Sequence, residues 1–468
     1  MSGWVPKFQG SSSGTTRWNI MRPPPAILFF AIVITLTFIY SLCFNPFKLS
    51  ADYSRNLTII VSEKHPTPTK KAEFPALNCS TETNFPTTFN PDDVDPSSTH
   101  VCPGYFRWIQ EDLRPWKATG ISREMVEKAK RTAHFRLVIV NGKAYVEKYR
   151  KSIQTRDVFT IWGILQLLRK YPGRIPDLEL MFDCDDQPVI RSGGRNTTGP
   201  PPLFRYCGDR WTRDVVFPDW SFWGWAEINI RPWEGLLKEL QQGNNRSKWI
   251  EREPYAYWKG NPHVAETRKD LLKCNLSGTH DWNARLYIQK YILACDSVTL
   301  LVKPKYYDFF TRSLEPLHHY WPVRDDDKCK SIKFAVDWGN NHKQKAQSIG
   351  KAASDFIQQE LKMEYVYDYM FHMLTEYASL LKFEPEVPQG AVELWSETMA
   401  SSANGTEKKF MMESLVKEPS LTSPCTMPPP FEPKALGDFY RSNLNLIRQV
   451  EKWENKYWES ANTQNTKS

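Results

Sequence analysis

The sequence predicts an α/β protein with two lobes. A chain of 468 residues is long for one domain and can bury more than one core. Apolar strands are expected at Asp177–Phe182 and within Tyr291–Val302. Helices are expected at Arg156–Tyr171, Gln344–Lys362 and Glu364–Leu381. Buried strands that alternate with helices are typical of sheets covered on both faces.

The chain begins with features of a membrane protein. Ala26–Phe44 contains nineteen residues without a charge, close to the roughly 20 that a membrane-spanning helix needs. Three basic residues and no acidic residue precede it, which favours a cytosolic N-terminus. We therefore expect a cytosolic tail at 1–25, a transmembrane anchor at 26–44 and a lumenal body, which is a single-pass type II arrangement. A cleaved signal peptide is the alternative.

The part beyond the anchor has features expected of a lumenal protein. Residues 45–99 are rich in Pro, Thr, Ser and Asn, which is typical of a flexible stem. Eight of the nine cysteines lie beyond the anchor without a CxxC or His-rich cluster. This pattern favours disulfides over a zinc site, although it does not specify the pairing. N-glycosylation sequons occur at Asn56, Asn78, Asn196, Asn245, Asn275 and Asn404.

The folded region is expected at 100–384. It opens with a short amphipathic helix, and Asn141 and Gly142 predict a hairpin turn inside Phe135–Tyr149. Residues 385–468 form a Pro- and Ser-rich tail that ends in a helix. The 61 basic and 53 acidic residues are spread along the chain, which argues against nucleic-acid binding.

Three acidic residues follow the strand that ends at Phe182. Asp183, Asp185 and Asp186 stand where ligand groups gather in open α/β sheets. They are open to three interpretations: acids of a surface turn, a metal clamp for a nucleotide diphosphate, or a general base that takes a proton from a hydroxyl nucleophile. The three residues alone do not decide between these interpretations.

A basic turn follows another expected strand. Lys259, Gly260 and Asn261 end or follow the strand-like YAYWK, and Arg268 begins a helix. Cations, a permissive backbone and a helix N-terminus can converge on one anion, for which a diphosphate is the obvious candidate. A solvated basic turn is the plainer alternative.

The segment Pro218–Trp233 holds four tryptophans in sixteen residues. Such density occurs in hydrophobic cores, and it also suits a surface that stacks on sugar rings while indole N–H groups donate to hydroxyls. We expect Trp220 and Trp223 to be core residues and Trp233 to contact a ligand. Together with the acids and the basic turn, this segment favours a sugar-diphosphate site.

Five stretches form a recognisable series along the chain: CPGYFRWIQEDL, FDCDDQP, PDWSFWGWAEINIRPWE, YWKGNP followed by TRKDLL, and KYILACDSVTLLVKPKYYDFF. Over roughly residues 102–381 the chain resembles the family 90 glycosyltransferases, the Rumi or protein O-glucosyltransferase group, in its plant form. The resemblance implies two Rossmann-like lobes of the GT-B type. It also implies inverting transfer of glucose or xylose from UDP-glucose or UDP-xylose to a serine-type hydroxyl of a lumenal protein or glycan. It implies no metal or other cofactor, and a location in the Golgi or endoplasmic reticulum membrane.

The resemblance also implies roles for the positions that match. Asp186 falls where the family has its catalytic base, whereas Asp183 and Asp185 have no assigned role. Because no metal neutralises the departing UDP, cationic groups must stabilise it. The positions assigned to the donor are Lys259, Gly260, Asn261 and Arg268, and those assigned to the acceptor and sugar are Ile228, Asn229, Ile230, Arg231, Pro232 and Trp233.

The chain departs from the family pattern at one place. Between Gln289 and Lys290, family members carry a further segment with a cysteine, a strand and a loop that touches the donor diphosphate. The resemblance therefore implies a donor lobe that is truncated near 289–290. Two alternatives stay open: an inactive family member or splice variant that acts as a lumenal binding or assembly protein, and a metal-dependent transferase that uses Asp183 and Asp185.

Overall fold

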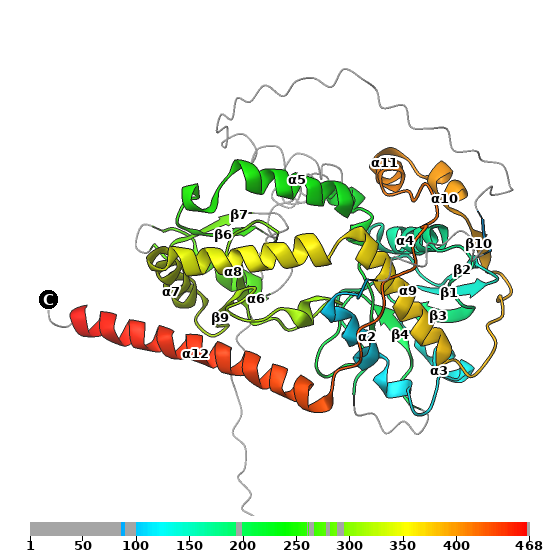
Figure 1. Ribbon diagram of the computed structural model, residues 1–468, viewed down its shortest axis with the longest axis horizontal. Coiled ribbons are helices and arrows are strands. Elements are labelled where there is room, and N and C mark those ends of the chain that lie inside the picture. The colour runs from blue at the N-terminus through cyan, green and yellow to red at the C-terminus, as the bar shows by residue number, and fades with distance from the viewer. Residues whose placement is uncertain are drawn as a thin grey trace, which may run out of the picture. The chain divides into compact units, whose positions relative to one another are not determined.

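The computed structural model describes residues 86–88, 100–192, 199–259, 261, 266–277, 281–287 and 294–465 (Figure 1). The predicted anchor at 26–44 lies outside these residues, and so does the predicted stem apart from 86–88. Within the described part, no helix combines the length and the apolar character needed to cross a membrane.

Helices and strands are mixed through the described chain, which confirms the α/β class. The strands are β1 (Phe135–Val140), β2 (Lys143–Lys148), β3 (Leu178–Phe182), β4 (Leu203–Arg205), β5 (Val215–Val216), β6 (Ala256–Lys259), β7 (Ala284–Tyr287), β8 (Leu300–Val302), β9 (Trp321–Val323) and β10 (Val392–Leu394). The α-helices are α2 (Arg107–Asp112), α3 (Arg123–Ala129), α4 (Arg156–Lys170), α5 (Trp233–Arg246), α6 (Glu266–Lys269), α7 (Lys328–Asn341), α8 (Lys343–Asp355), α9 (Met363–Ser379), α10 (Ser396–Ser402), α11 (Gly405–Glu413) and α12 (Pro433–Asn465).

A six-stranded sheet with the order β10-β2-β1-β3-β4-β5 organises one region of the protein. Strand β1 pairs antiparallel with β2 and β3, whereas β4 runs parallel to both β3 and β5. Asn141 and Gly142 turn the β1–β2 hairpin with φ angles of 52° and 73°, as the sequence predicts. Strand β10 comes from the predicted tail and pairs with β2, so the tail is part of this sheet.

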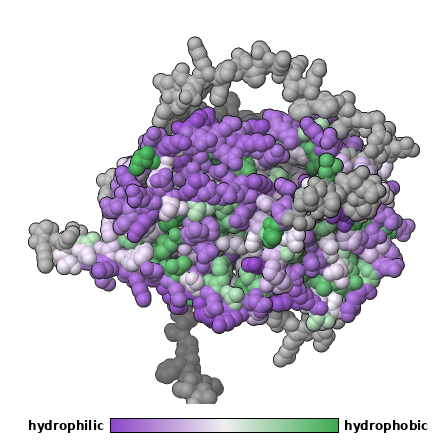
Figure 2. Space-filling model, in the orientation of Figure 1, coloured by the Kyte–Doolittle hydropathy of each residue, from purple (hydrophilic) through white to green (hydrophobic). Residues whose placement is uncertain are grey.

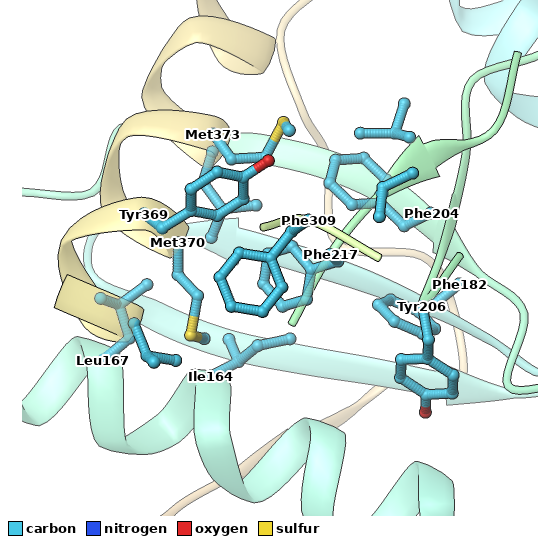
Figure 3. Packing of buried hydrophobic residues seen from close by; sticks show 14 of the residues in the cluster. Ile164, Leu167, Phe182, Phe204, Tyr206, Phe217, Phe309, Tyr369, Met370 and Met373 are labelled. Carbon is cyan, nitrogen blue, oxygen red and sulfur yellow. The ribbon is translucent and has the colours of Figure 1, made fainter. Parts of the chain in front are cut away.

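A large hydrophobic cluster surrounds the six-stranded sheet. Ile164 and Leu167 of α4, together with Met370 and Met373 of α9, meet aromatic side chains from the sheet region (Figure 3). Burying one large apolar side chain contributes about 1.5–3 kcal/mol. Helices packed in this way fix the strand ends, which is where the candidate site begins.

A smaller hydrophobic cluster organises a second region, around two separate two-stranded sheets. Strand β6 pairs with β7 and β8 pairs with β9, and both pairs are parallel. Within the described part of the apolar run expected at Tyr291–Val302, residues 294–302, the strand is Leu300–Val302, because turns and bends occupy residues 294–297 and Asp296 has a φ of 43°.

Disulfides are present, as the cysteine pattern favours. Cys102 is bonded to Cys425, and Cys274 is bonded to Cys329. The face in Figure 2 is predominantly hydrophilic, with small separated hydrophobic areas. The sequon residues that are described and exposed are Asn245, Asn275 and Asn404.

Candidate functional site

The predicted acidic residues lie at the carboxyl end of β3. Phe182 of β3 is paired with Phe204 of β4, and the N–H of Asp183 donates to the Phe204 carbonyl oxygen at 3.0 Å. The carboxyl ends of parallel strands meet at one edge of a sheet, where ligands bind in open α/β folds. Residues 183–186 therefore lie beside the residues that follow β4.

Asp183 is the buried member of the acidic group. Its carboxylate lies 3.0 Å from Arg205 Nη2, 3.1 Å from His134 Nδ1 and 3.3 Å from Arg150 Nη2. It also accepts a hydrogen bond from the N–H of Asp185. Burial raises the pKa of Asp183, but hydrogen bonding with His134 and the charge of Arg205 outweigh burial, and the net pKa is lowered. Asp183 is thus an internal anion that holds the strand end together.

A metal ion is one ligand that this edge could hold. The ligand atoms of His134, Asp183 and Asp185 all lie within 4.8 Å of one another. However, Arg205 and Arg150 already contact Asp183, and a divalent cation beside them would be repelled by both guanidinium groups. The charges of this cluster therefore favour an internal network over a metal clamp.

Asp186 is the exposed member of the acidic group. Its side chain is 71% exposed, and Arg156 contacts both carboxylate oxygens, with Nη1 2.6 Å from Oδ1 and Nη2 3.4 Å from Oδ2. The Cys207 thiol donates to the Asp186 backbone carbonyl oxygen at 2.8 Å. Burial raises the pKa of this thiol to about 12, so it remains a protonated donor. A carboxylate that faces solvent while an arginine holds its orientation can act as a general base.

Arg156, the first residue of α4, is 6% exposed. Its Nη1 also donates to the Cys184 carbonyl oxygen at 3.1 Å, and its guanidinium carbon lies 4.4 Å from the centre of the Trp220 ring. A guanidinium group over an indole face is attracted by the ring quadrupole. Helix α4, the end of β3 and the aromatic segment therefore all fix the arginine that contacts Asp186.

The aromatic segment Pro218–Trp233 contributes mainly to the core. Trp220 and Trp223 are buried, as predicted, and the Trp223 indole N–H donates to the Tyr367 hydroxyl at 3.0 Å. Trp233 is 6% exposed, and its indole N–H donates to the Leu361 carbonyl oxygen at 2.7 Å. The structure thus uses the polar group of Trp233 inside the protein, and its contact with a ligand stays a prediction.

The other predicted acceptor residues differ in exposure along the chain. Ile228 and Asn229 are exposed, Ile230 and Arg231 are half-buried, and Pro232 is buried. Asn229 has a φ of 53° and ends a short 3₁₀-helix, η5 (Ala226–Ile228). Ile228 and Asn229 are therefore the most exposed residues of the stretch.

The residues just before this stretch contact those that precede α4, and Trp225 is joined to Ile230 of the stretch by two backbone hydrogen bonds. The Trp225 indole N–H donates to Gln154 Oε1 at 2.9 Å, and Thr155 Oγ1 donates to Glu227 Oε2 at 3.0 Å. Arg156 follows Thr155 directly and contacts the predicted base. The structure therefore brings the predicted acceptor stretch and the predicted base to the same end of α4.

The predicted donor residues belong to the second region. Lys259 is the last residue of β6, Asn261 is exposed, and Arg268 is exposed on α6. Gly260 lies outside the described residues. Strand β6 packs in the smaller cluster, whereas Asp186 follows a strand of the six-stranded sheet. The predicted base and the predicted donor turn thus come from different sheets, and their action on one substrate stays a prediction.

Several residues that shape this site were not predicted. They lie far from Asp186 in the sequence, and the fold brings them to the end of β3. One of them could have been found from its place in the sequence. An arginine in the first turn of a helix lies at the positive end of the helix dipole, so it needs an acidic partner. The residues are His134, Arg150, Arg156, Arg205 and Cys207.

Comparison with known proteins identifies a family pattern over most of the chain. A family model described as Glycosyl transferase family 90 matches residues 97–290 and 287–454. The two matched pieces together span more than half of the chain. They meet at 287–290, which is where the resemblance places the missing segment.

Named relatives are similar over about three fifths of the chain. O-glucosyltransferase rumi of Drosophila melanogaster is 21% identical over 342 residues, which are 63% of this chain and 81% of the relative. Protein O-glucosyltransferase 1 of Bos taurus is 23% identical over 340 residues, 62% of this chain and 84% of the relative. Protein O-glucosyltransferase 3 of Homo sapiens is 24% identical over 336 residues, 62% of this chain and 65% of the relative.

Proposed function

Because the chain belongs to glycosyl transferase family 90, we propose that it is an inverting glycosyltransferase that moves glucose or xylose from a UDP-sugar to a hydroxyl group. The acceptor is a serine-type hydroxyl of a lumenal protein, or a glycan. The relatives named protein O-glucosyltransferase support a glucosyl donor and a protein acceptor.

The observation that carries this proposal is the oriented, exposed carboxylate of Asp186 at the end of β3. In the proposed reaction, Asp186 takes the proton of the acceptor hydroxyl while the hydroxyl oxygen attacks the anomeric carbon of the sugar. The bond from that carbon to UDP breaks on the opposite face, so the configuration inverts. General-base assistance of this kind contributes about 10²–10⁴-fold to a rate.

The leaving UDP needs positive charge, because no metal is proposed to neutralise it. Lys259, Gly260, Asn261 and Arg268 are the proposed donor contacts. Their position on the second region supports a GT-B arrangement in which the two hydrophobic clusters are two lobes, one for the acceptor and one for the donor.

We propose that the enzyme resides in the Golgi or endoplasmic reticulum membrane as a single-pass type II protein. Residues 26–44 would be the anchor and residues 45–99 the stem. The two disulfides of the described residues support an oxidising compartment for the body of the protein.

Matched substitutions of two neighbouring acids test the role of Asp186. Asp186→Asn should lower transfer by about 10²–10⁴-fold, while UDP affinity measured by calorimetry stays within about threefold because the donor turn is untouched. Asp185→Asn is the control, since Asp185 contacts Arg150 and His134 but lies outside the proposed chemistry. Unchanged turnover in Asp186→Asn would remove Asp186 from the mechanism.

The metal-dependent alternative makes a different prediction in the same assay. A clamp formed by Asp183 and Asp185 requires that EDTA abolish transfer and that Asp185→Asn be the more damaging substitution. We expect transfer to persist in EDTA, because Arg205 and Arg150 already satisfy the charge of Asp183. Loss of transfer in EDTA would favour the metal-dependent mechanism.

The second candidate function is a catalytically inactive member that acts as a lumenal binding or assembly protein. The observation that favours it is that the described residues of the second region form two two-stranded sheets that do not join, together with the family match that breaks at 287–290. Calorimetry with UDP separates the candidates. Absence of UDP binding and of transfer in the full chain would support the inactive candidate.

A further inference from the structure

We propose that Arg156 is a positioning residue for Asp186, which fixes the carboxylate from inside the protein and determines which of its lone pairs face the acceptor. The inference rests on the proposed role of Asp186 as the general base. It assigns to the first residue of α4 a task in the reaction, although that residue is too buried to meet the acceptor.

An exposed aspartate needs an anchor if it is to serve as a directional base. The Asp186 side chain is 71% exposed, so packing leaves its rotamers largely free. Arg156 restricts it through two charge-assisted contacts, at 2.6 Å to Oδ1 and 3.4 Å to Oδ2. The planar fork of a guanidinium group matches a carboxylate and fixes its plane as well as its position.

The anchor itself is fixed, which separates this pair from an ordinary surface ion pair. The Arg156 side chain is 7% exposed, lies over the Trp220 ring and donates to the Cys184 carbonyl oxygen. Its own carbonyl oxygen accepts a hydrogen bond from Thr160 Oγ1 at 2.7 Å. A surface pair would lose side-chain entropy on both partners and gain little, whereas here one partner is already ordered by the core.

This geometry leaves a defined part of the carboxylate for the substrate. A carboxylate offers about four lone-pair positions, and Arg156 faces one on each oxygen of Asp186. The Asp186 side chain is 71% exposed, so the remaining positions are open to a hydroxyl from solvent. A displacement of about 1 Å in a reacting group can cost on the order of 10²-fold in rate, so loss of the anchor should appear in kcat.

The first arm of the test is structural and needs no activity. Crystal structures of the full chain and of Arg156→Gln are compared, with Arg150→Gln as the matched control. The Arg150→Gln substitution removes the same charge from the same strand end. Arg150, however, contacts Asp183 and Asp185. We expect a single Asp186 orientation in the parent and in Arg150→Gln, and several in Arg156→Gln. An unchanged Asp186 in Arg156→Gln would overturn the inference whether or not the chain is active.

The second arm measures the kinetic consequence. Arg156→Gln should lower kcat on the order of 10²-fold, with the donor KM within about threefold of the parent. Arg156→Lys should recover part of the loss, about tenfold, because it keeps the charge without the fork. Thermal unfolding of both variants shows whether either has lost its fold. If Arg156→Gln does not fold, the kinetic comparison is made with Arg156→Lys instead.

A double substitution separates this inference from the proposed function. If Arg156 acts through Asp186, Arg156→Gln should change the residual turnover of Asp186→Asn by less than about twofold, since coupled residues are not additive. Full additivity, or a loss that falls on KM alone, would overturn the positioning role while leaving Asp186 as the base. Normal turnover in Asp186→Asn would instead reject the proposed function.

Discussion

The two regions of the protein differ in the continuity of their sheets. The first has six strands in one sheet, and the catalytic candidate follows one of them. The second has two parallel pairs that do not join within the described residues. Parallel strands normally occur in larger sheets with helices on both faces, so a two-stranded parallel sheet is an incomplete element rather than a typical one.

The contrast indicates that the residues proposed to handle the acceptor and those proposed to handle the donor are held in place by different amounts of surrounding structure. The groups expected to handle the acceptor are fixed by a continuous core, buried ion pairs and a stacked arginine. The groups expected to handle the donor lie at or after the end of strand β6 and on helix α6, and within the described residues β6 pairs with one strand, β7. The resemblance implies a further family segment with a strand between Gln289 and Lys290, and we propose that its absence accounts for the division seen within the described residues.

Removal of the disulfides should have the largest effect and compares the two regions directly. Cys102→Ser with Cys425→Ser opens a crosslink with a sequence separation of 323, whereas Cys274→Ser with Cys329→Ser opens one of 55. Loop entropy predicts losses of about 6 and about 4 kcal/mol in unfolding free energy. Denaturant titration under non-reducing conditions measures both. A larger loss for the second pair would show that the divided region depends more on its crosslink.

Loss of a buried ion pair should rank next. Arg205→Leu removes the closest guanidinium group of Asp183 and leaves Arg150 at 3.3 Å, and breaking a buried ion pair costs up to about 3–5 kcal/mol. Lys273→Gln is the matched change in the second region, since the Lys273–Asp270 pair is exposed. It should leave the unfolding transition unchanged. Equal midpoints for both variants in urea would contradict the role of Asp183 as an internal anion.

The sequence predicted the elements of both regions better than their connections. Local signals located the hairpin turn at Asn141 and Gly142, the helix that begins at Arg156 and the strand that ends at Phe182. Period and turn residues act over a few positions, so they are readable from the chain alone. The place of β10 in the sheet was not predicted, because it depends on a contact between residues 392–394 and 144–146.

The candidate site shows the same limit. The three acids after Phe182 look alike in sequence, yet the fold makes Asp183 a buried anion and Asp186 an exposed group. Their difference comes from residues that are distant in the chain, such as Arg205 and Arg156. Likewise, the density of tryptophans in the aromatic segment suited both a hydrophobic core and a ligand surface. The burial of Trp233 depends on a distant partner, the Leu361 carbonyl oxygen that accepts its indole N–H.

Insertion of the segment that the resemblance implies should test whether the divided sheets of the second region limit UDP binding. The corresponding segment of a family relative is inserted between Gln289 and Lys290, and a Gly/Ser linker of equal length is the control. A hydrogen bond to a charged group contributes about 1.5–3 kcal/mol, so two regained diphosphate contacts should raise UDP affinity on the order of 10²-fold. Calorimetry should show this gain for the family segment alone. Equal affinity in all three proteins would mean that the divided sheets do not limit donor binding.

The smallest effect is expected where the two regions adjoin in the chain. Tyr320 belongs to the larger cluster and Trp321 to the smaller one. His319 precedes both, is 8% exposed and accepts a hydrogen bond from the Glu315 N–H at Nδ1. Burial, and then the charge of His318, lower the pKa of His319 to about 4. The folded protein thus keeps this imidazole neutral.

The sign of the pH effect follows from that lowered pKa. As pH falls through about 6.5, the unfolded chain binds a proton at this histidine and the folded protein does not. The contribution is therefore fully present above pH 7 and is lost progressively toward pH 4, with about 2 kcal/mol lost by pH 5. His319→Asn can accept the same N–H without titrating, so its unfolding free energy should fall by about 2 kcal/mol less between pH 7 and pH 5. Parallel pH profiles for the two proteins would show that the junction is not held by a neutral His319.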